Sequence, residues 1–394
     1  MKKKTLISFF AAAILMNVAA NLAHPVTPTL IQNLNLPDYM FGAAFAAMMF
    51  SNFLFSPFWG KRNEYKNSRN TIAFCSIGYA AGQFLFAVEK TEGTILLARI
   101  FSGVFTGGIF ISMLTYLVRI SKEEDRGKNL AILAAISSVA SAFGYFIGGL
   151  LGEISIGLAF GLQVGLLLLS SPVFYLVCTE DNPKPLKISY REMIRTSNPF
   201  HSFMEARRFM NPTFLLLFLL CGLAFLGNTA FEQCFNYYIK DVYGLSSGYN
   251  GTIKALIGIV ALLANGTICI WILQKANSKR AMIYIMLLGT LSIFWVAGMK
   301  SQFMFIGLSI LFFTINAISI PIMQDMVSRE ASISDRSIVM GFYNGVKSLG
   351  GIIGALAAGG LYTIQPIFPI LFAGIAFFAA TVFSMLFYFN RTAR

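Results

Sequence analysis

The sequence predicts an all-α integral membrane protein in which twelve transmembrane helices form two pseudo-symmetric six-helix bundles. Three observations lead to this prediction: long apolar segments, an alternation of basic and charge-poor loops, and an internal repeat. Hydrophobic residues make up 56% of the 394 residues and charged residues only 12%. This is more apolar surface than a water-soluble core can bury. We therefore expect the lipid bilayer to be a partner of the chain.

Apolar segments long enough to span a membrane recur along the whole chain. A helix needs about 20 mostly apolar residues to cross the hydrocarbon core of a bilayer. Twelve segments of this kind are separated by charges or turn residues. They cover residues 6–30, 40–60, 71–88, 93–119, 128–152, 155–179, 212–239, 247–274, 281–299, 302–327, 337–361 and 366–390.

Basic residues concentrate in alternate loops between these segments. The loops on one predicted side hold most of the 30 Lys and Arg residues, whereas those on the other hold only Lys90, Lys240 and Lys300. Because basic loops stay in the cytoplasm, both termini are expected to be cytoplasmic. The net charge of +13 is thus explained by membrane orientation. No basic helix or RNA-type motif accompanies it, so we expect no nucleic acid partner.

An internal repeat divides the spans into two sets of six. Two stretches before and within spans five and eleven match at a separation of 210 residues. The repeat predicts an N-terminal bundle at 1–179, a cytoplasmic linker at 180–211 and a C-terminal bundle at 212–394. The matched residues are Asp125 and Arg126 with Asp335 and Arg336, and Gly144 and Gly149 with Gly354 and Gly359.

The opening segment MKKKTLISFFAAAILMNVAANLAHP could also be a cleaved secretory signal, because lysines precede an apolar run. However, Asn17, Asn21 and His24 fall on one predicted helix face, which a signal has no use for. The second half also needs a counterpart of its own first span. We therefore expect this segment to be retained as span one, with a bend near Pro25 and Pro28.

Four charged residues inside the spans are the main candidates for function: Arg99, Glu232, Lys254 and Lys347. Each costs at least about 2.5–3.5 kcal/mol to insert and persists only where a cavity or partner relieves it. We expect them to border a shared aqueous cavity. Three cations against one anion favour a small-molecule substrate that is amphiphilic and carries an anionic or zwitterionic group.

Polar residues accompany these charges at helical spacing, as Asn228 and Asn236 do for Glu232. Glu232 is expected to be the only well-buried carboxylate and is the first candidate for proton uptake and release. It lies at a depth similar to that of Lys254, so the two form either a permanent structural pair or one that responds to substrate or protons. His24 is either a packing histidine or a titrating group.

Composition also argues against an enzyme. The chain has two His and five scattered Cys residues without metal-ligand spacing. The spans contain no Ser/His/Asp constellation, and no Walker A loop occurs. We therefore expect no catalytic residue, metal or cofactor, and energy from a gradient, most simply of protons.

Three stretches match short sequence signatures. SPFWGKRNEYKNSRNTI is similar to the loop signature G-x-x-x-D-R-x-G-R-K, and the matching residues are Gly60, Lys61, Glu64 and Arg69. LLARIFSGVFTGG is similar to R-x-x-x-G-x-x-x-G through Arg99, Gly103 and Gly107. GYFIGG is similar to G-P-x-x-G-G through Gly144, Gly148 and Gly149, with Tyr145 at the position of the proline. With these stretches the chain resembles the major facilitator superfamily of transporters, and within it the twelve-span bacterial drug:proton antiporters.

The resemblance implies a secondary active transporter that works by alternating access, most simply a proton-coupled exporter of drugs or other amphiphiles. It implies a monomer in a bacterial-type plasma membrane, helix packing at the glycines, and a cytoplasmic gate. Uptake or exchange of an organic anion, a lipid-linked flippase, a membrane enzyme and a transporter-like sensor are the alternatives. The gate candidates are Gly60, Glu64, Arg69, Asp125, Arg126, Asp335 and Arg336.

Overall fold

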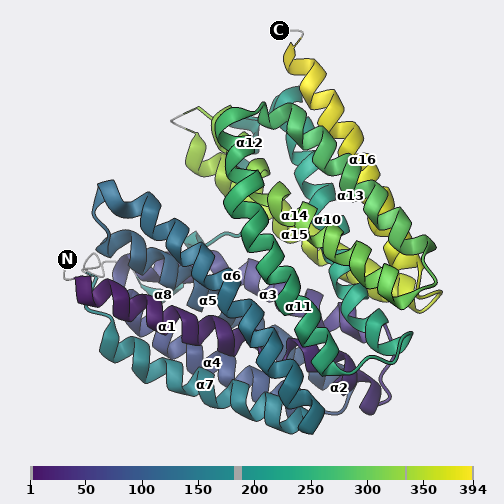
Figure 1. Ribbon diagram of the computed structural model, residues 1–394. Coiled ribbons are helices and arrows are strands. Elements are labelled where there is room, and N and C mark those ends of the chain that lie inside the picture. The colour runs from purple at the N-terminus through teal and green to yellow at the C-terminus, as the bar shows by residue number, and fades with distance from the viewer. Residues whose placement is uncertain (1–2, 182–188, 333–334, 393–394) are drawn as a thin grey trace. The chain divides into compact units, whose positions relative to one another are not determined.

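A computed structural model of the protein describes residues 3–181, 189–332 and 335–392, and every regular element in these ranges is a helix (Figure 1). Twelve helices in the described residues are long and apolar enough to cross a membrane, which confirms the twelve predicted spans. They cover Thr5–Asn33, Met40–Tyr65, Ser68–Val88, Glu92–Ile120, Glu123–Ile154, Ile156–Val177, Pro212–Asp241, Ser247–Lys275, Ser278–Gly298, Gln302–Glu330, Ile338–Tyr362 and Phe368–Asn390.

Polar residues at the predicted loop ends start several of these helices. Asn211 accepts a hydrogen bond from the backbone N–H of Phe214, and Pro212 follows it at the first position of α10 (Pro212–Asp241). Asn277 caps α13 (Ser278–Gly298) in the same way. Side-chain oxygens at these positions satisfy N–H groups that have no partner inside the helix.

The first span is bent, as its prolines predict. It consists of α1 (Lys3–Asn21), the 3₁₀ turn η1 (His24–Val26) and the short α2 (Thr27–Asn33). Pro25 and Pro28 stand in the first turns of η1 and α2, where a missing N–H costs nothing. His24 therefore lies after the end of α1, whereas the sequence placed it on one helix face with Asn17 and Asn21. In contrast, α14 (Gln302–Glu330) continues through Pro321.

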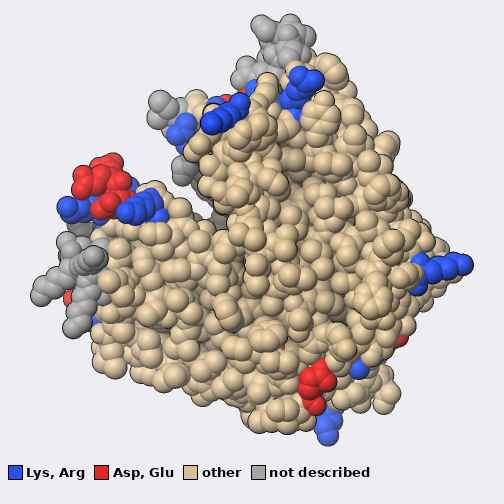
Figure 2. Space-filling view, viewed as in Figure 1, with Lys and Arg blue, Asp and Glu red and all other residues tan. Residues whose placement is uncertain are grey.

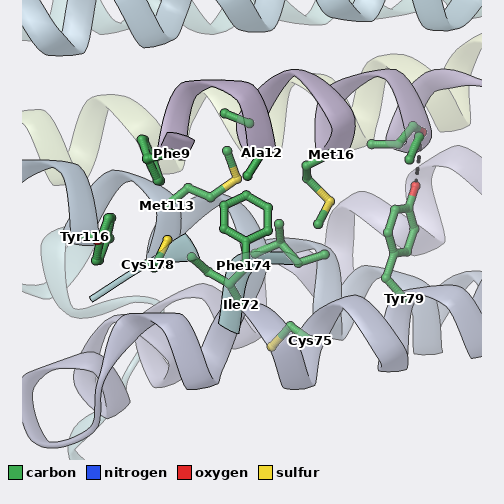
Figure 3. Close-up of a cluster of buried hydrophobic side chains, with 14 of the residues drawn as sticks. Phe9, Ala12, Met16, Ile72, Cys75, Tyr79, Met113, Tyr116, Phe174 and Cys178 are labelled. Atoms are coloured by element: carbon green, nitrogen blue, oxygen red, sulfur yellow. Dashed lines mark hydrogen bonds between the residues drawn. The ribbon is translucent and has the colours of Figure 1, made fainter. Parts of the chain in front are cut away.

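Unit 1 is a compact body made of residues 1–36, 47–199 and 246–258. In it α1 packs on α6 (Glu123–Ile154) and α7 (Ile156–Val177), and α4 (Ser68–Val88) packs on α5 (Glu92–Ile120) and α7. Figure 3 shows part of the core between these helices, where the rings of Phe9 and Tyr116 lie 5.2 Å apart and the Tyr79 hydroxyl donates to the carbonyl of Ala20.

Unit 2 is a compact body made of residues 37–46, 200–245 and 259–394. Here α10 packs on α15 (Arg336–Tyr362) and α16 (Phe368–Thr392), and α13 packs on α14 and α16 (Figure 1). These pairings repeat those of α1 and α4 in unit 1, as the internal repeat predicts. Its core is aromatic, with the rings of Phe231 and Phe312 4.6 Å apart.

Two spans contribute to both units. The start of α3 (Met40–Tyr65) belongs to unit 2, and the rest of that helix belongs to unit 1. The span Ser247–Lys275 consists of α11 (Ser247–Ala264), a π-helical turn at Asn265–Cys269 and α12 (Ile270–Lys275). Its residues up to Gly258 belong to unit 1 and the following ones to unit 2. The division of the sequence into 1–179, 180–211 and 212–394 stays a prediction.

The linker also has described elements in each unit. In unit 1, α8 (Tyr190–Thr196) buries Met193. In unit 2, α9 (His201–Met204) and η2 (Glu205–Arg208) follow, and the ring of Phe203 lies 4.7 Å from that of Phe342 on α15. On the face shown in Figure 2, Lys, Arg, Asp and Glu lie at the helix ends, and the wide surface between these ends carries none. Such a surface suits the hydrocarbon core of a bilayer.

Candidate functional site

In unit 1, a cluster of three residues from three elements contains two of the predicted site residues. The rings of His24 and Tyr145 are stacked, with centroids 5.5 Å apart and planes at 14°. The Nζ of Lys254 lies 5.9 Å from the centroid of the Tyr145 ring. Lys254 is only 7% exposed. The bend after α1, the middle of α6 and the first half of α11 thus bring an imidazole and an ammonium group to one aromatic ring.

Amide side chains also lie on the first span and on α11. Asn250, one turn before Lys254, is buried and its Oδ1 has no hydrogen-bond partner in the described residues. Asn21 donates to the hydroxyl of Ser141 on α6 at 2.9 Å. Asn17 is buried and donates to the carbonyl of Ala13 on its own helix at 2.8 Å. The Oδ1 of Asn250 can therefore accept a further hydrogen bond. In contrast, the side-chain N–H groups of Asn17 and Asn21 already donate to α1 and, for Asn21, to Ser141 on α6.

Arg99 lies inside the helix packing of unit 1. It is 5% exposed. Its guanidinium carbon lies 3.5 Å from the centroid of the Phe86 ring, and Nη1 lies 3.7 Å from the sulfur of Met48. Its Nε has no hydrogen-bond partner in the described part of the chain. An aromatic face stabilises a desolvated cation, so these contacts partly offset the cost of burying Arg99.

Buried amides on α4 and α7 of the same unit were missed by sequence reasoning. Gln83 on α4 lies one turn from Phe86 on the same helix, and its Oε1 has no partner among the described residues. Gln163 on α7 donates to the carbonyls of Ala19 and Ala20 at 3.1 and 3.3 Å, where α1 approaches its end. The signal was present, because an amide in an apolar span is also costly to bury, but amides were considered only where they accompany a charged residue or a histidine at helical spacing.

In unit 2, the predicted stripe on α10 is present. Asn228, Glu232 and Asn236 are all partly exposed, so Glu232 is less buried than expected. The Oδ1 of Asn228 accepts a hydrogen bond of 2.8 Å from Asn316 on α14. The Oδ1 of Asn236 has no partner in the described residues. Asn316, which the sequence did not single out, thus fixes one end of the stripe.

Lys347 also belongs to unit 2, on α15. Its Nζ lies 5.1 Å from the centroid of the Phe225 ring of α10, and the residue itself is exposed. Lys254 and Glu232 belong to different units, so their pairing stays a prediction.

The predicted gate residues of the first half lie in unit 1, and most of their interactions are local. Glu64 pairs with Lys61 on its own helix at 3.1 Å. Arg69 at the start of α4 donates to Glu180 at 2.8 Å and to the carbonyl of Cys178 at 3.2 Å. A Cβ built on Gly60 would have a single atom within 4 Å, the Cγ2 of Ile111 at 3.9 Å.

Beside Arg69 lies the one Asp or Glu residue that is buried among the described residues, Asp181. Its side chain is 0% exposed. It accepts hydrogen bonds from the backbone and hydroxyl of Ser68, at 3.0 and 2.5 Å, and from Arg119 at 2.9 Å. This carboxylate connects the ends of α4, α5 and α7, and it corrects the expectation that Glu232 is the best-buried carboxylate.

The repeated gate pairs differ in their surroundings. Asp125 is exposed, and the buried Nε of Arg126 has no partner in the described residues. Asp335 accepts a hydrogen bond of 2.7 Å from Ser332, and Arg336 is exposed. Of these four residues, Asp335 thus has a local side-chain hydrogen bond, and the gate role of both pairs stays a prediction.

The predicted packing glycines lie where helix backbones meet. In unit 1, Gly103 and Gly107 on α5 face α3, and Gly144 and Gly148 face α1. In unit 2, Gly354 faces the backbone of Leu226 on α10, and a Cβ on Gly359 would lie 2.5 Å from the carbonyl oxygen of Tyr39. A side chain at these positions would push the backbones apart.

Each unit offers charged groups together with aromatic rings or amides. Among the described residues, no group of three or more His, Cys, Asp or Glu is placed to hold a metal ion. Unit 1 offers the ammonium group of Lys254, the ring of Tyr145 and the amide of Asn250. Unit 2 offers the carboxylate of Glu232, the ammonium group of Lys347 and the amide of Asn236.

Comparisons with known proteins concern the sequence and the fold of the chain. Residues 7–355 match the family described as the Major Facilitator Superfamily. Multidrug resistance protein 2 of Bacillus subtilis strain 168 is 22% identical over 352 residues, which cover 89% of this chain and 86% of the relative. The quinolone resistance protein NorA of Staphylococcus aureus strain MSSA476 is 24% identical over 241 residues, 61% of this chain and 60% of that relative.

Solved structures share the fold. A bacterial homologue of the human lysosomal transporter Spinster, in an inward-facing and occupied conformation, superposes with a TM-score of 0.79 at 12% identity over 97% of this chain and 96% of its own. The human organic anion transporter MFSD10 gives a TM-score of 0.68 at 17% identity, with 98% of each chain covered.

Proposed function

The chain belongs to the Major Facilitator Superfamily, whose members are transporters and not enzymes, and from this premise we propose that it exports amphiphilic small molecules in exchange for protons. The favoured substrates carry a zwitterionic or anionic group. The protein works as a monomer in the bacterial plasma membrane, with both termini in the cytoplasm, and alternates access to its substrate site.

The similarity to multidrug resistance proteins carries this proposal. The Bacillus relative is matched over 89% of this chain, so the similarity is not confined to one shared helix or loop. The name of a second relative refers to quinolone resistance. Quinolones of the norfloxacin type are amphiphilic and zwitterionic, which fits the charges of the candidate site.

The charges within the spans support the preference for such a substrate. Lys254 and Lys347 each lie near an aromatic ring, at 5.9 and 5.1 Å. A ring beside an ammonium group offers a flat apolar surface and a cation together. A planar molecule with a carboxylate can use both, whereas a purely cationic drug meets repulsion from the lysines.

Glu232 is the proposed proton carrier. It lies within the span Pro212–Asp241 and is partly exposed, so it can exchange protons with water. A carboxylate in this position changes charge when a proton binds or leaves. The charge change alters the free energy of each conformation of the protein, because a charged group is costly where water is excluded. Arg99 is not proposed as a proton carrier, because it is buried against Phe86 and Met48, whereas Glu232 is partly exposed.

Uptake or exchange of an organic anion is the second candidate. Three of the four candidate charges inside the spans are cationic, which favours an anion as substrate. The likeness to the human organic anion transporter concerns the fold alone. The direction of substrate transport and its coupling to proton movement distinguish the two candidate functions.

The test is transport into liposomes that contain the purified protein and an imposed pH gradient. Norfloxacin serves as the zwitterionic probe, ethidium as the cationic probe and fluorescein as the anionic probe. Proton exchange predicts that an acidic lumen drives norfloxacin inward, beyond its passive distribution in protein-free liposomes. Symport predicts that an acidic exterior does so.

Glu232→Gln tests the proton carrier. Gradient-driven uptake should be lost, whereas exchange of labelled for unlabelled norfloxacin at equal pH should remain, because exchange needs no net proton movement. The proposal fails if the wild type moves none of the probes, or if the Gln variant still concentrates norfloxacin in response to the gradient.

A further inference from the structure

Tyr145 stands at the position where the antiporter signature has proline, and it contacts two of the candidate site residues. Its ring stacks with that of His24 at 5.5 Å and lies 5.9 Å from the Nζ of Lys254. We propose that Tyr145 is a positioning residue that holds His24 and Lys254 in the geometry that substrate binding requires. This inference rests on the proposed function, since it assigns His24 and Lys254 to transport.

The backbone at Tyr145 favours this role. A proline removes one helical hydrogen bond and its ring collides with the preceding turn, whereas tyrosine keeps the N–H. In agreement, α6 is one helix over Glu123–Ile154. The helix then presents Gly144 and Gly148 to α1 and Gly149 to α11.

Close contacts on both sides of α6 fix the place of the Tyr145 ring. A Cβ built on Gly144 would lie 2.5 Å from the carbonyl oxygen of Val18 on α1. A Cβ built on Gly251 of α11 would lie 2.5 Å from the carbonyl oxygen of Tyr145 itself. Because α6 cannot shift toward either neighbour, the ring is a fixed platform between the bend of the first span and α11.

The contacts of the ring explain what it positions. The face of an aromatic ring attracts a cation, which keeps the ammonium group of Lys254 close to it. Stacking keeps the imidazole of His24 nearly parallel to the ring. Glu153, near the C-terminal end of α6, accepts a hydrogen bond of 2.6 Å from the backbone N–H of Gly248 and thereby holds the start of α11. Lys254 therefore projects from a segment that is itself anchored.

Chemical labelling tests the positioning without any need for transport. Diethylpyrocarbonate modifies exposed histidines, and the chain contains only His24 and His201. His201 is exposed and lies in the other unit, so it serves as an internal reference. Acetic anhydride acetylates exposed lysines, so the modification of Lys254 is compared with that of the exposed Lys300. Mass spectrometry of the labelled protein, folded in nanodiscs, measures the His24:His201 and Lys254:Lys300 labelling ratios.

Four variants make the test specific. Tyr145→Leu and Tyr145→Met remove the ring, and the flexible methionine side chain keeps the variant packed if leucine does not. Tyr145→Phe keeps the ring and removes only the hydroxyl. Phe143→Leu is the matched control, because Phe143 lies on the same helix and is 57% exposed.

We expect the His24:His201 and Lys254:Lys300 labelling ratios to rise several-fold in Tyr145→Leu and Tyr145→Met and to stay at the wild-type level in Tyr145→Phe and Phe143→Leu. The KM for norfloxacin should rise in the same two variants alone. The inference is overturned if both ring-deleting variants leave the two ratios unchanged, or if Tyr145→Phe behaves as they do. A protein that moves no norfloxacin but shows the labelling changes would refute the proposed function and retain the positioning.

Discussion

Gly149 of α6 and Gly251 of α11 face each other with no side chain between their backbones. A Cβ built on Gly149 would lie 2.9 Å from the Cα of Gly251, and one built on Gly251 would lie 3.0 Å from the Cα of Gly149. Lipid supplies no hydrophobic drive for helices to associate, so close packing of this kind holds α11 against α6.

Alanine at this contact should therefore destabilise the protein. We expect Gly251→Ala to lower the free energy of unfolding by about 1–3 kcal/mol, as overpacking does in other tightly packed interiors. Titration with a denaturing detergent measures this change. Gly165→Ala is the control, because a Cβ at Gly165 meets no atom within 4 Å. Equal unfolding free energies for the two variants would contradict the close contact.

The hydrogen bond between Tyr237 and Asp38 should stabilise unit 2. The Tyr237 hydroxyl donates to Oδ1 of Asp38 at 2.6 Å, and the Tyr237 ring stacks on that of Phe41 at 4.8 Å. A hydrogen bond to a charged group contributes about 1.5–3 kcal/mol. Because Asp38 is partly exposed, we expect Tyr237→Phe to lower the free energy of unfolding by about 1.5 kcal/mol, the lower end of this range.

A double-mutant cycle with Asp38→Ala isolates this bond, because alanine has no acceptor for the Tyr237 hydroxyl. The two single changes should not add, since both remove the same interaction. Tyr249→Phe, at a tyrosine that is 61% exposed, should be neutral. Strict additivity in the cycle would argue against the bond.

Asp181 should matter far more than its neighbour Glu180. Breaking a buried ion pair costs about 3–5 kcal/mol, and since Arg119 is 25% exposed we expect Asp181→Asn to cost about 2–3 kcal/mol. Glu180 pairs with Arg69 but is 64% exposed. Surface pairs contribute about 0–1 kcal/mol, so Glu180→Gln should change little. Similar unfolding free energies for both variants would show that Asp181 is not buried in solution.

Native cysteines should not interfere with labelling, which allows a test of membrane orientation. All five are free and buried, so a membrane-impermeant maleimide should leave the folded wild type unmodified. Lys90 and Lys122 are both exposed and lie in loops predicted to be on opposite sides. In intact cells, Lys90→Cys should react and Lys122→Cys should react only after permeabilisation. The reverse pattern would invert the proposed orientation.

The spans could be predicted because the bilayer fixes the length and the polarity of a crossing helix. Glycines that match in the repeat also make similar backbone contacts: Gly149 packs against α11 in unit 1, and Gly359, 210 residues later, packs against the residues just before α3 in unit 2. Glycine spacing survives in the sequence because no other residue fits between the backbones.

Other features depend on tertiary contacts and could not be predicted. Asp181 follows α7 in a polar linker, yet it is buried because Ser68 and Arg119 converge on it. Nothing in its local sequence distinguishes it from Glu180. In contrast, Asn316, Gln83 and Gln163 lie in apolar spans, and extending the cost argument from charges to amides would have found them.

The assignment of segments 37–46 and 246–258 to the units has a consequence for the two halves of the sequence. Gly42 packs on the backbone of Ala355, and Gly251 packs on that of Tyr145, so each half contributes the start of a helix that packs on a helix of the other half. Either half expressed alone would therefore lack both of these backbone contacts.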